Sequence, residues 1–380
     1  MSPIYLDHAA TTPIDDRVLA AMQPFLTTQF YNPSAQYSAG RLVRTSLEKA
    51  RGQVAQTLGA SPSEIIFTAG GTEANNVAIH GVMRQHSGAE LLISSIEHAA
   101  VSAPAADYQM KMISVTADGR LDLDDAANKI TDSTVLISCM YANNEIGTVQ
   151  PIRALARLVQ QVRRTRLNKG LVMPLYLHID ACQAPNYLDV HVARLGIDLM
   201  TLNGSKIYGP KQSGVLYIKR GIVLKPLISG GGQEHGLRSG TENVAASVGF
   251  ATALDIAAQL RNSEAARLEQ LQNKCLHEIQ EQLPQAQVNG SMKYRLPNNV
   301  HLTLPGTDNE RLLLQLDELA IMAAAGSACS ASSQLPSSVL RALGLDDETA
   351  QSSIRFTMGR STTEADVNHL VSTLKRLVTA

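Results

Sequence analysis

Between residues 64 and 219, short apolar runs of strand length alternate with longer segments of helical periodicity. Each run is rich in aliphatic and β-branched residues and ends at turn residues, which is typical of buried strands. The predicted strands are residues 64–68, 90–95, 112–115, 134–140, 175–179, 199–202 and 215–219, and the predicted helices between them are 72–85, 98–109, 122–129 and 151–167. This alternation predicts an α/β fold with a mainly parallel seven-stranded sheet and helices on both faces.

The flanking segments have a different order of elements. Residues 1–13 suggest an extended arm, and helical patterns follow at 15–25 and 38–58. A long helical pattern from 241 to 283, expected to break or bend near Asn262, leads into strands at 299–304 and 353–358 and helices at 309–319, 337–343 and 364–378. We therefore expect an arm (1–13), a large domain (14–260) and a smaller α+β domain (261–380).

The composition limits the functional classes. The chain has 380 residues, 44% of them hydrophobic and 18% charged, and a net charge of −1, so no strong basic field favours nucleic acid or membrane surfaces. Four cysteines without metal-ligand spacing predict neither a metal site nor a disulfide framework, and they suit a reducing cytoplasm. We also expect no signal peptide and no membrane span.

The segment from 174 to 206 carries the first chemical signal. Its predicted strand ends on Asp180, and the next strand is followed by Lys206. Ligands of α/β sheets bind at such strand ends. Pyridoxal phosphate (PLP) needs a lysine to form a Schiff base and a carboxylate beside its ring nitrogen. Taken alone, however, Asp180 is more simply a helix cap and Lys206 a solvated loop lysine, of which Lys211 is another example.

Polar motifs follow other predicted strands and precede the long helix. Gly71 and Thr72 lie where a predicted strand joins a predicted helix and suit a phosphate, although a plain N-cap is the simpler explanation. His98 is able to stack on a cofactor ring and move protons, although a surface histidine would also fit. Asn144 suits a carboxylate or a cofactor oxygen, although Asn is common in turns. Thr241 offers a hydroxyl to a phosphate, although it too suits an N-cap.

Two residues of the predicted smaller domain attract attention. Cys329 lies in a run of small residues, which give a thiol mobility and access. By contrast, Cys139 within a strand is typical of an inert buried cysteine, and Cys182 is most simply a packing residue. Arg355 lies inside an apolar strand, and a buried arginine requires an anion, which is either a structural carboxylate or a substrate carboxylate.

Together, in this order, these motifs resemble the cysteine desulfurases of the NifS/IscS-like group, which are class V PLP-dependent enzymes. The resemblance covers nearly the whole chain. It rests on residues 5–12, 32–34, 67–73, 97–98, 143–147, 178–183, 206–211, 238–241, 326–329 and 353–356. It implies the aminotransferase type I fold and a homodimer.

For the cofactor ring, the resemblance implies that Lys206 holds PLP. Asp180 then pairs with the ring nitrogen, Gln183 with the phenolic oxygen, and His98 stacks on the ring. These roles give Lys206 and His98 catalytic functions as well.

For the cofactor phosphate, the resemblance implies contacts from Gly71, Thr72 and, across the dimer interface, Thr241. The family usually has Ser-Gly-His or Ser-Ala-His before the lysine, whereas this chain has Asn203 and Ser205 at the corresponding ends of the triplet. Both side chains are able to donate hydrogen bonds, but the possible histidine charge is lost, so we expect weaker PLP retention.

For the substrate, the resemblance implies that Asn144 and Arg355 position the carboxylate of L-cysteine and that Cys329 accepts its sulfur. The persulfide then passes to an acceptor protein, such as an iron–sulfur scaffold or another sulfur carrier. Two alternatives share the fold: a selenocysteine lyase, and a PLP-fold scaffold without turnover. A nucleotide-binding enzyme is disfavoured because no G-x-G-x-x-G motif follows a strand.

We predict that Lys206 rather than Lys211 binds PLP covalently, because only Lys206 directly follows the loop expected at the phosphate. Borohydride reduction and peptide mapping should place the label on Lys206. Lys206→Ala should lose the adduct, whereas Lys211→Ala should keep it. A label on Lys211 would overturn the assignment.

Overall fold

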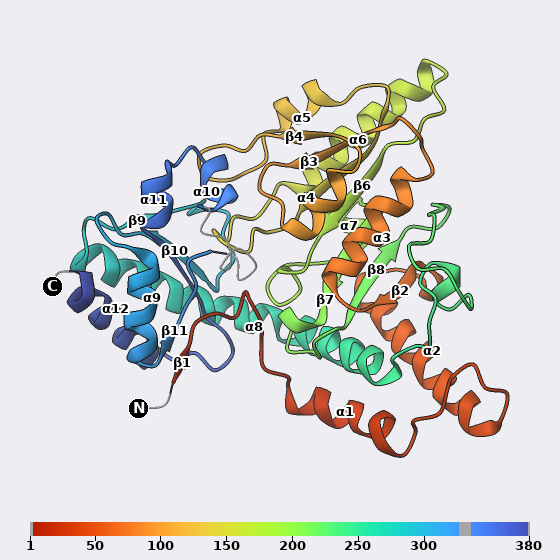
Figure 1. Cartoon of the computed structure of the whole chain (residues 1–380), viewed down its shortest axis with the longest axis horizontal. Coiled ribbons are helices and arrows are strands. Elements are labelled where there is room, and N and C mark those ends of the chain that lie inside the picture. Colours follow the sequence, from red (N-terminus) through yellow and green to blue (C-terminus); the bar gives the residue numbers. More distant parts are fainter. Residues whose placement is uncertain (1–2, 327–335, 379–380) are drawn as a thin grey trace.

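The computed structural model describes residues 3–326 and 336–378 (Figure 1). Its large sheet has the strand order β2-β8-β7-β6-β5-β3-β4, in which β8 is antiparallel to β2 and β7 and all other neighbours are parallel. The strands are β2 (Ile65–Thr68), β3 (Glu90–Ser94), β4 (Gln109–Ile113), β5 (Thr134–Met140), β6 (Tyr176–Asp180), β7 (Leu199–Asn203) and β8 (Gly214–Ile218). The predicted mainly parallel α/β sheet is confirmed.

Helices cover both faces of this sheet because its strands are buried on both sides. Successive side chains of a strand point to opposite faces, so Leu92 packs on one core while Leu91 and Ile93 pack on the other. The first core includes α2 (Ser38–Leu58) and α6 (Ile152–Asn168), and the second includes α3 (Gly71–Met83) and α4 (Ala99–Ala105). The remaining helices of this part are α1 (Asp16–Thr27), α5 (Leu123–Lys129) and α7 (Val192–Leu195).

A separate hydrophobic core, called the smaller core below, lies beside the two cores of the large sheet. It includes a three-stranded antiparallel sheet, β12-β10-β9, and a parallel pair between the N-terminal β1 and β11. Leu6 of the N-terminal segment packs into this core. The elements around this core are β1 (Ile4–Tyr5), β9 (Gln287–Val288), β10 (Asn299–Thr303), α9 (Asn309–Glu318), β11 (Ile321–Met322), β12 (Ser353–Thr357) and α12 (Glu364–Val378). The short helices α10 (Ser338–Ala342) and α11 (Asp347–Gln351) instead pack in a separate cluster with Ile96, Met140 and Ile146.

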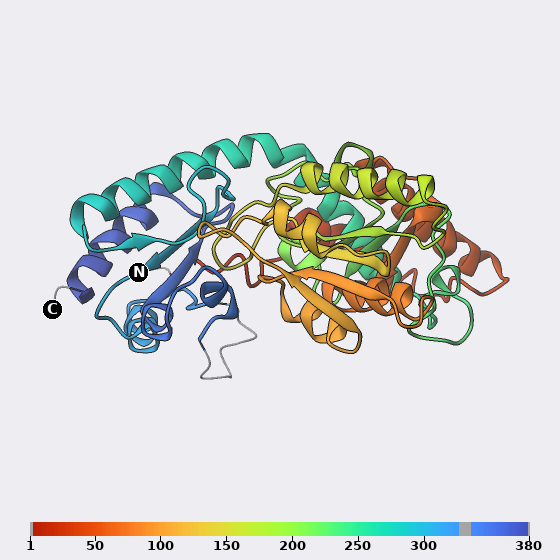
Figure 2. The same ribbon diagram turned by 90° about the horizontal axis from the view of Figure 1, so that it is seen from above.

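One long helix, α8 (Val244–Gln282), joins the first core of the large sheet to the smaller core (Figures 1 and 2). Its first half buries Phe250 and Leu254 in the first core, and its second half buries Leu276 and Ile279 in the smaller one. Of the break or bend predicted near Asn262, the break is wrong, because the helix is continuous through that position. Packing on a different core at each end stabilises a single helix across a stretch whose own sequence is polar.

At the edge of the sheet, the predicted strand and helix are present, but their predicted bounds are wrong. The strand expected at 112–115 is β4 (Gln109–Ile113), and the helix expected to reach residue 109 ends at Ala105 as α4. Strand β4 is an edge strand with one neighbour, and it exposes Gln109 and Lys111, so its apolar pattern is weak. Its bounds follow from pairing with β3, which begins at Glu90 opposite Gln109.

Within residues 3–326 and 336–378, no helix combines the length and the apolar character needed to cross a bilayer.

A buried ion pair connects the segment before α8 to α2. Both guanidinium NH groups of Arg51, on α2, donate to the Glu234 carboxylate, at 2.7 and 2.8 Å. The Phe67 N–H donates to the same carboxylate at 2.7 Å. Both charged side chains are nearly inaccessible to solvent. Burial of a single charge would be costly, and the ion pair reduces that cost because each side chain compensates the charge of the other.

We predict that Glu234→Gln lowers the free energy of unfolding by about 3 to 5 kcal/mol, because it removes the buried carboxylate partner of Arg51 and leaves only the half-exposed Glu48 beside that charge. Glu48→Gln is the matched control, since Glu48 also pairs with Arg51 but is about half exposed. The control should cost less than about 1 kcal/mol. Urea unfolding measures both, and equal effects of the two changes would contradict the prediction.

Candidate active site

A cavity of about 210 Å³ lies at the carboxyl ends of β5, β6 and β7, where the N-terminal segment crosses the sheet edge. Parallel strands bring the residues that follow them to one edge, which explains why distant motifs meet there. Nine of the residues predicted from the sequence line this cavity: Gly71, Thr72, His98, Asn144, Asp180, Gln183, Asn203, Lys206 and Arg355.

Lys206 reaches the cavity from a short turn after β7. The Asn203 side chain caps this turn by accepting the Ser205 N–H at 3.1 Å. The Lys206 amine donates to the Ala10 carbonyl of the N-terminal segment. The Lys211 amine instead donates to the Thr12 carbonyl at 2.9 Å, and Lys211 does not line the cavity.

Asp180 is the last residue of β6, and its carboxylate is held on both oxygens. Oδ2 accepts the Asn75 side-chain amide at 2.7 Å, and Oδ1 accepts the Cys182 N–H at 3.0 Å. Only 8% of Asp180 is exposed. Gln183, one turn further on, donates its side-chain amide to the Ala9 carbonyl at 2.9 Å. The acid and the amide therefore face the cavity in fixed orientations.

His98 caps the N-terminus of α4, and its Nδ1 accepts the Ala100 N–H at 3.0 Å. A neutral ring with Nδ1 as acceptor carries its proton on Nε2. Burial lowers the pKa of His98, the nearby Asp180 raises it in part, and Lys206 lowers it further. The ring is therefore neutral at pH 7 and able either to accept or to donate a proton.

The start of α3 forms another wall of the cavity. Gly70, with a φ of 132°, caps the helix, and Gly71 follows as its first residue. A Cβ at position 71 would lie 2.7 Å from the Cys182 sulfur, so only glycine fits without a shift. The first N–H groups of such a helix, together with its dipole, suit an anion such as phosphate.

Arg355 is 1% exposed and has one carboxylate partner. It donates to Asp7 at 2.6 Å and to the Asn144 carbonyl at 2.8 Å. Within the described residues its Nε has no hydrogen-bond partner, although the side chain lines the cavity. The sequence left a structural or a substrate carboxylate open as the partner of Arg355, and in the structure the structural carboxylate of Asp7 is that partner.

Three predicted residues are not among those that line the cavity. The Ser205 hydroxyl donates to the Asn203 side chain at 3.1 Å, so these two residues bond to each other. Thr241 lines a separate cavity of about 160 Å³, together with Thr68 and Ala69. Cys329 lies outside the described residues.

The thiols of the three described cysteines are free but protonated. Burial raises the pKa of Cys139 and of Cys182 well above the ordinary value, with Glu97 adding to the effect at Cys139 and Asp180 at Cys182. Burial likewise raises the pKa of Cys275 to about 12. None of the three is therefore a thiolate at neutral pH. Among the described residues, no cluster of His, Cys, Asp or Glu side chains is able to hold a metal ion.

Sequence reasoning assigned no role to several parts of the site. The carbonyls of Ala9 and Ala10 hold Gln183 and Lys206, and Asn75 holds Asp180. These contacts join segments that are far apart in the sequence, so the local pattern around each residue does not predict them. The available signal was that these residues lie in or next to motifs already singled out. The alanines lie in the 5–12 motif, and Asn75 lies one turn after Gly71.

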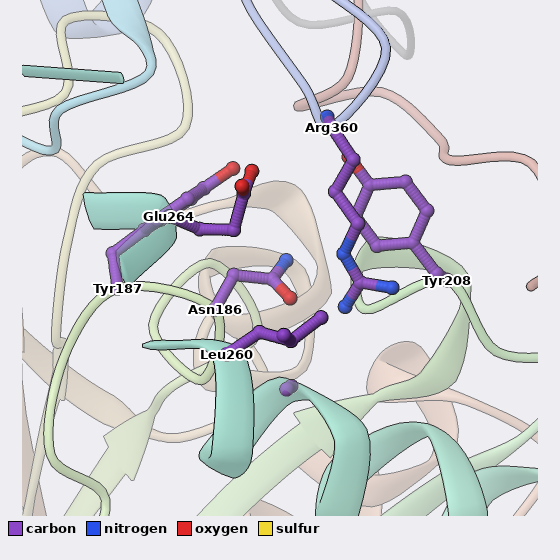
Figure 3. Close-up of a pocket in the computed structure, with 7 residues that line it drawn as sticks. Asn186, Tyr187, Tyr208, Leu260, Glu264 and Arg360 are labelled. Carbon is purple, nitrogen blue, oxygen red and sulfur yellow. The ribbon is translucent and has the colours of Figure 1, made fainter. Parts of the chain in front are cut away.

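A further, very small cavity is lined by Asn186, Tyr208 and Arg360, among others (Figure 3). Its volume of about 10 Å³ is at the lower limit for one water molecule. The Arg360 guanidinium lies 3.9 Å from the centre of the Tyr208 ring and donates to Asp15 at 2.9 Å. Asn186, on the same cavity, donates to the Lys206 carbonyl at 2.8 Å. Arg360, which follows β12, thus braces the turn that carries the lysine.

Comparisons with known proteins agree with this arrangement. The Aminotransferase class-V family matches residues 4–370, and the chain belongs to that family. It is 40% identical to the cysteine desulfurase IscS of Dictyoglomus turgidum, covering 99% of this chain and 94% of the relative. It is 38% identical to cysteine desulfurase IscS 1 of Archaeoglobus fulgidus, covering 98% and 96%.

Solved structures give the same result for the fold. A NifS-like protein superposes with a TM-score of 0.90 at 31% identity, covering 99% of each chain. A NifS-like protein from Rickettsia africae superposes with a TM-score of 0.88 at 29% identity, covering both chains fully. The PLP-dependent fold expected from the sequence is therefore confirmed, and the relatives support a cysteine desulfurase function in sulfur transfer.

The neighbour of His98, Glu97, is a buried acid with its own pH dependence. Its carboxyl accepts the Met140 N–H at 2.7 Å and the Ser94 hydroxyl, which ties β3 to the end of β5. Burial raises the pKa of Glu97 to about 8, the two hydrogen bonds offset this in part, and Asp180 raises it further. The folded protein thus keeps a proton that the unfolded chain releases above pH 4.5.

Between pH 4.5 and 8, unfolding releases this proton, so the carboxyl destabilises the fold increasingly as the pH rises. We predict that Glu97→Gln, which stays neutral, becomes more stable relative to wild type by up to about 1.4 kcal/mol for each pH unit in that window. Urea unfolding at pH 5 and pH 8 tests this. Glu318→Gln, an exposed carboxyl on α9, is the control, and the same pH trend in both variants would contradict the assignment.

Proposed function

We propose that this chain is a PLP-dependent cysteine desulfurase that converts L-cysteine to L-alanine and holds the released sulfur as a persulfide on Cys329. One observation carries the proposal: the amine of Lys206 and the carboxylate of Asp180 open into one cavity, with the neutral ring of His98 on its wall. A lysine, an acid for the ring nitrogen and a flat proton carrier are the protein groups that PLP chemistry needs.

The donor set of the cavity fits PLP at both of its ends. The α3 N-terminus at Gly71 and Thr72 suits the phosphate, and Asp180 suits the ring nitrogen. Gln183 is placed on the same cavity for the phenolic oxygen. When bound, PLP supplies an electron sink that stabilises negative charge on the substrate carbon next to the nitrogen.

Residues of this chain bind the substrate and transfer its protons. Arg355 and Asn144 hold the substrate carboxylate, which places the Cα proton near Lys206. The Lys206 amine removes that proton, and Asp180 keeps the ring nitrogen protonated. His98, neutral at pH 7, returns protons to the alanine product.

The sulfur step belongs to Cys329. Its thiolate attacks the sulfur of the substrate, so an S–S bond forms while the substrate C–S bond breaks. The electron pair of the broken C–S bond stays with the substrate carbon. That carbon is then protonated, and the product leaves as alanine. The described cysteines support this assignment indirectly, because Cys139 and Cys275 are buried, Cys182 is partly buried, and all three thiols are protonated.

We further propose that the active form is a homodimer in the cytoplasm. Thr241 lines a cavity different from that of its own Lys206, so a contact of Thr241 with a phosphate would come from a second copy of the chain. The persulfide then passes to a sulfur-acceptor protein, such as an iron–sulfur scaffold or another sulfur carrier.

We predict that Cys329→Ser retains PLP and binds L-cysteine but releases almost no alanine under turnover, because serine offers no sulfur acceptor. Mass spectrometry of the wild type after incubation with L-cysteine should place the extra sulfur on Cys329. Cys182→Ser is the matched control, and there the persulfide should still lie on Cys329. Extra sulfur mainly on Cys182, or near-normal alanine release by Cys329→Ser, would overturn the proposal.

A further inference from the structure

Asn75 lies one turn into α3, and its side chain points to the acid of the site. It is 1% exposed, lines the cavity, and donates from Nδ2 to Asp180 Oδ2 at 2.7 Å. Residues four apart on a helix share a face, so Asn75 lies on the same face as Gly71. The helix that begins at the expected phosphate position therefore also contacts the acid expected at the ring nitrogen.

The chemistry of the two groups fixes which way the amide faces. An ionised carboxylate only accepts hydrogen bonds, so Asn75 must present its NH₂ group to Asp180. The Cys182 N–H occupies the other oxygen at 3.0 Å. Two bonds from separate segments prevent the carboxylate from rotating, and its remaining lone pairs are left for the cavity. The Asn75 Oδ1 is buried and has no hydrogen-bond partner within the described residues.

We propose that Asn75 is a positioning residue: it holds the Asp180 carboxylate in the orientation that pairs with the cofactor ring nitrogen, so that α3 sets both ends of the bound cofactor. This inference rests on the proposed function. A hydrogen bond to a carboxylate is charge-assisted and compensates the loss of water around a nearly buried acid. Without it, Asp180 would be free to turn and would lose one of its two fixed donors.

The neighbouring residue provides a matched control. Asn76 is also on α3, but its side chain donates to the Thr72 carbonyl at 2.9 Å and makes no contact with Asp180. Asn75→Asp and Asn76→Asp therefore introduce the same chemical change one residue apart. Only the first replaces the donor to Asp180 with a second carboxyl group, and a negative charge early in a helix is otherwise tolerated.

The test compares PLP binding in the two variants after reconstitution with PLP. Asn75→Asp should lose PLP to a scavenger during dialysis roughly tenfold faster than wild type or more, since one charge-assisted hydrogen bond is lost. Its visible absorption band should also shift, and kcat for L-cysteine should fall more than KM rises. Asn76→Asp should retain the wild-type band and a PLP loss rate within about twofold. The PLP loss rate of Asn75→Ala is measured as well, because this variant removes the same hydrogen bond without adding a charge.

A double variant tests whether the hydrogen bond between the two residues contributes to stability. Asn75→Asp combined with Asp180→Asn restores a hydrogen bond with the partners exchanged, so it should recover thermal stability but not the wild-type absorption band. Recovery of both would overturn the inference, as would an Asn75→Asp variant that behaves like Asn76→Asp. Wild-type protein that takes up no PLP would overturn the proposed function as well, whereas PLP uptake by wild type with unchanged Asn75 variants overturns only this inference.

Discussion

The site depends on two neighbouring parallel strands that end at the same edge of the sheet. Strands β6 and β7 pair in a register that places Asp180 opposite Thr201, so the turn after β7 begins beside the acid. Lys206 therefore faces the cavity that Asp180 also lines. Both strands are buried on both faces, and their pairing register fixes the position of the acid and of the turn that carries the amine.

The N-terminal segment completes the cavity and connects it to the smaller core. Its strand β1 pairs with β11, Leu6 packs in the smaller core, and a few residues later the Ala10 carbonyl accepts the Lys206 amine. Arg355, on β12, pairs with Asp7 of the same segment. A substrate carboxylate bound at Arg355 would therefore contact a guanidinium that is already held by the smaller core and the N-terminal segment.

Several features of the fold and site were predictable because they depend on local patterns. The buried strands ending at Asp180 and Asn203 are marked by their apolar runs, and the residues after them follow at fixed spacing. The strand β4 was misplaced because its exposed edge residues carry no apolar pattern. The role of Asn75 was missed because it depends on how α3 is rotated against β6, which tertiary packing decides. The continuity of α8 likewise depends on packing at both of its ends.

The absorption spectrum of the purified wild-type protein tests the central claim most directly, because the claim is that this cavity binds PLP through Lys206. The account predicts a visible absorption band that is present on purification or appears after PLP is added, and that borohydride abolishes. A protein that remains without a visible band in excess PLP, although it is folded, would contradict the account.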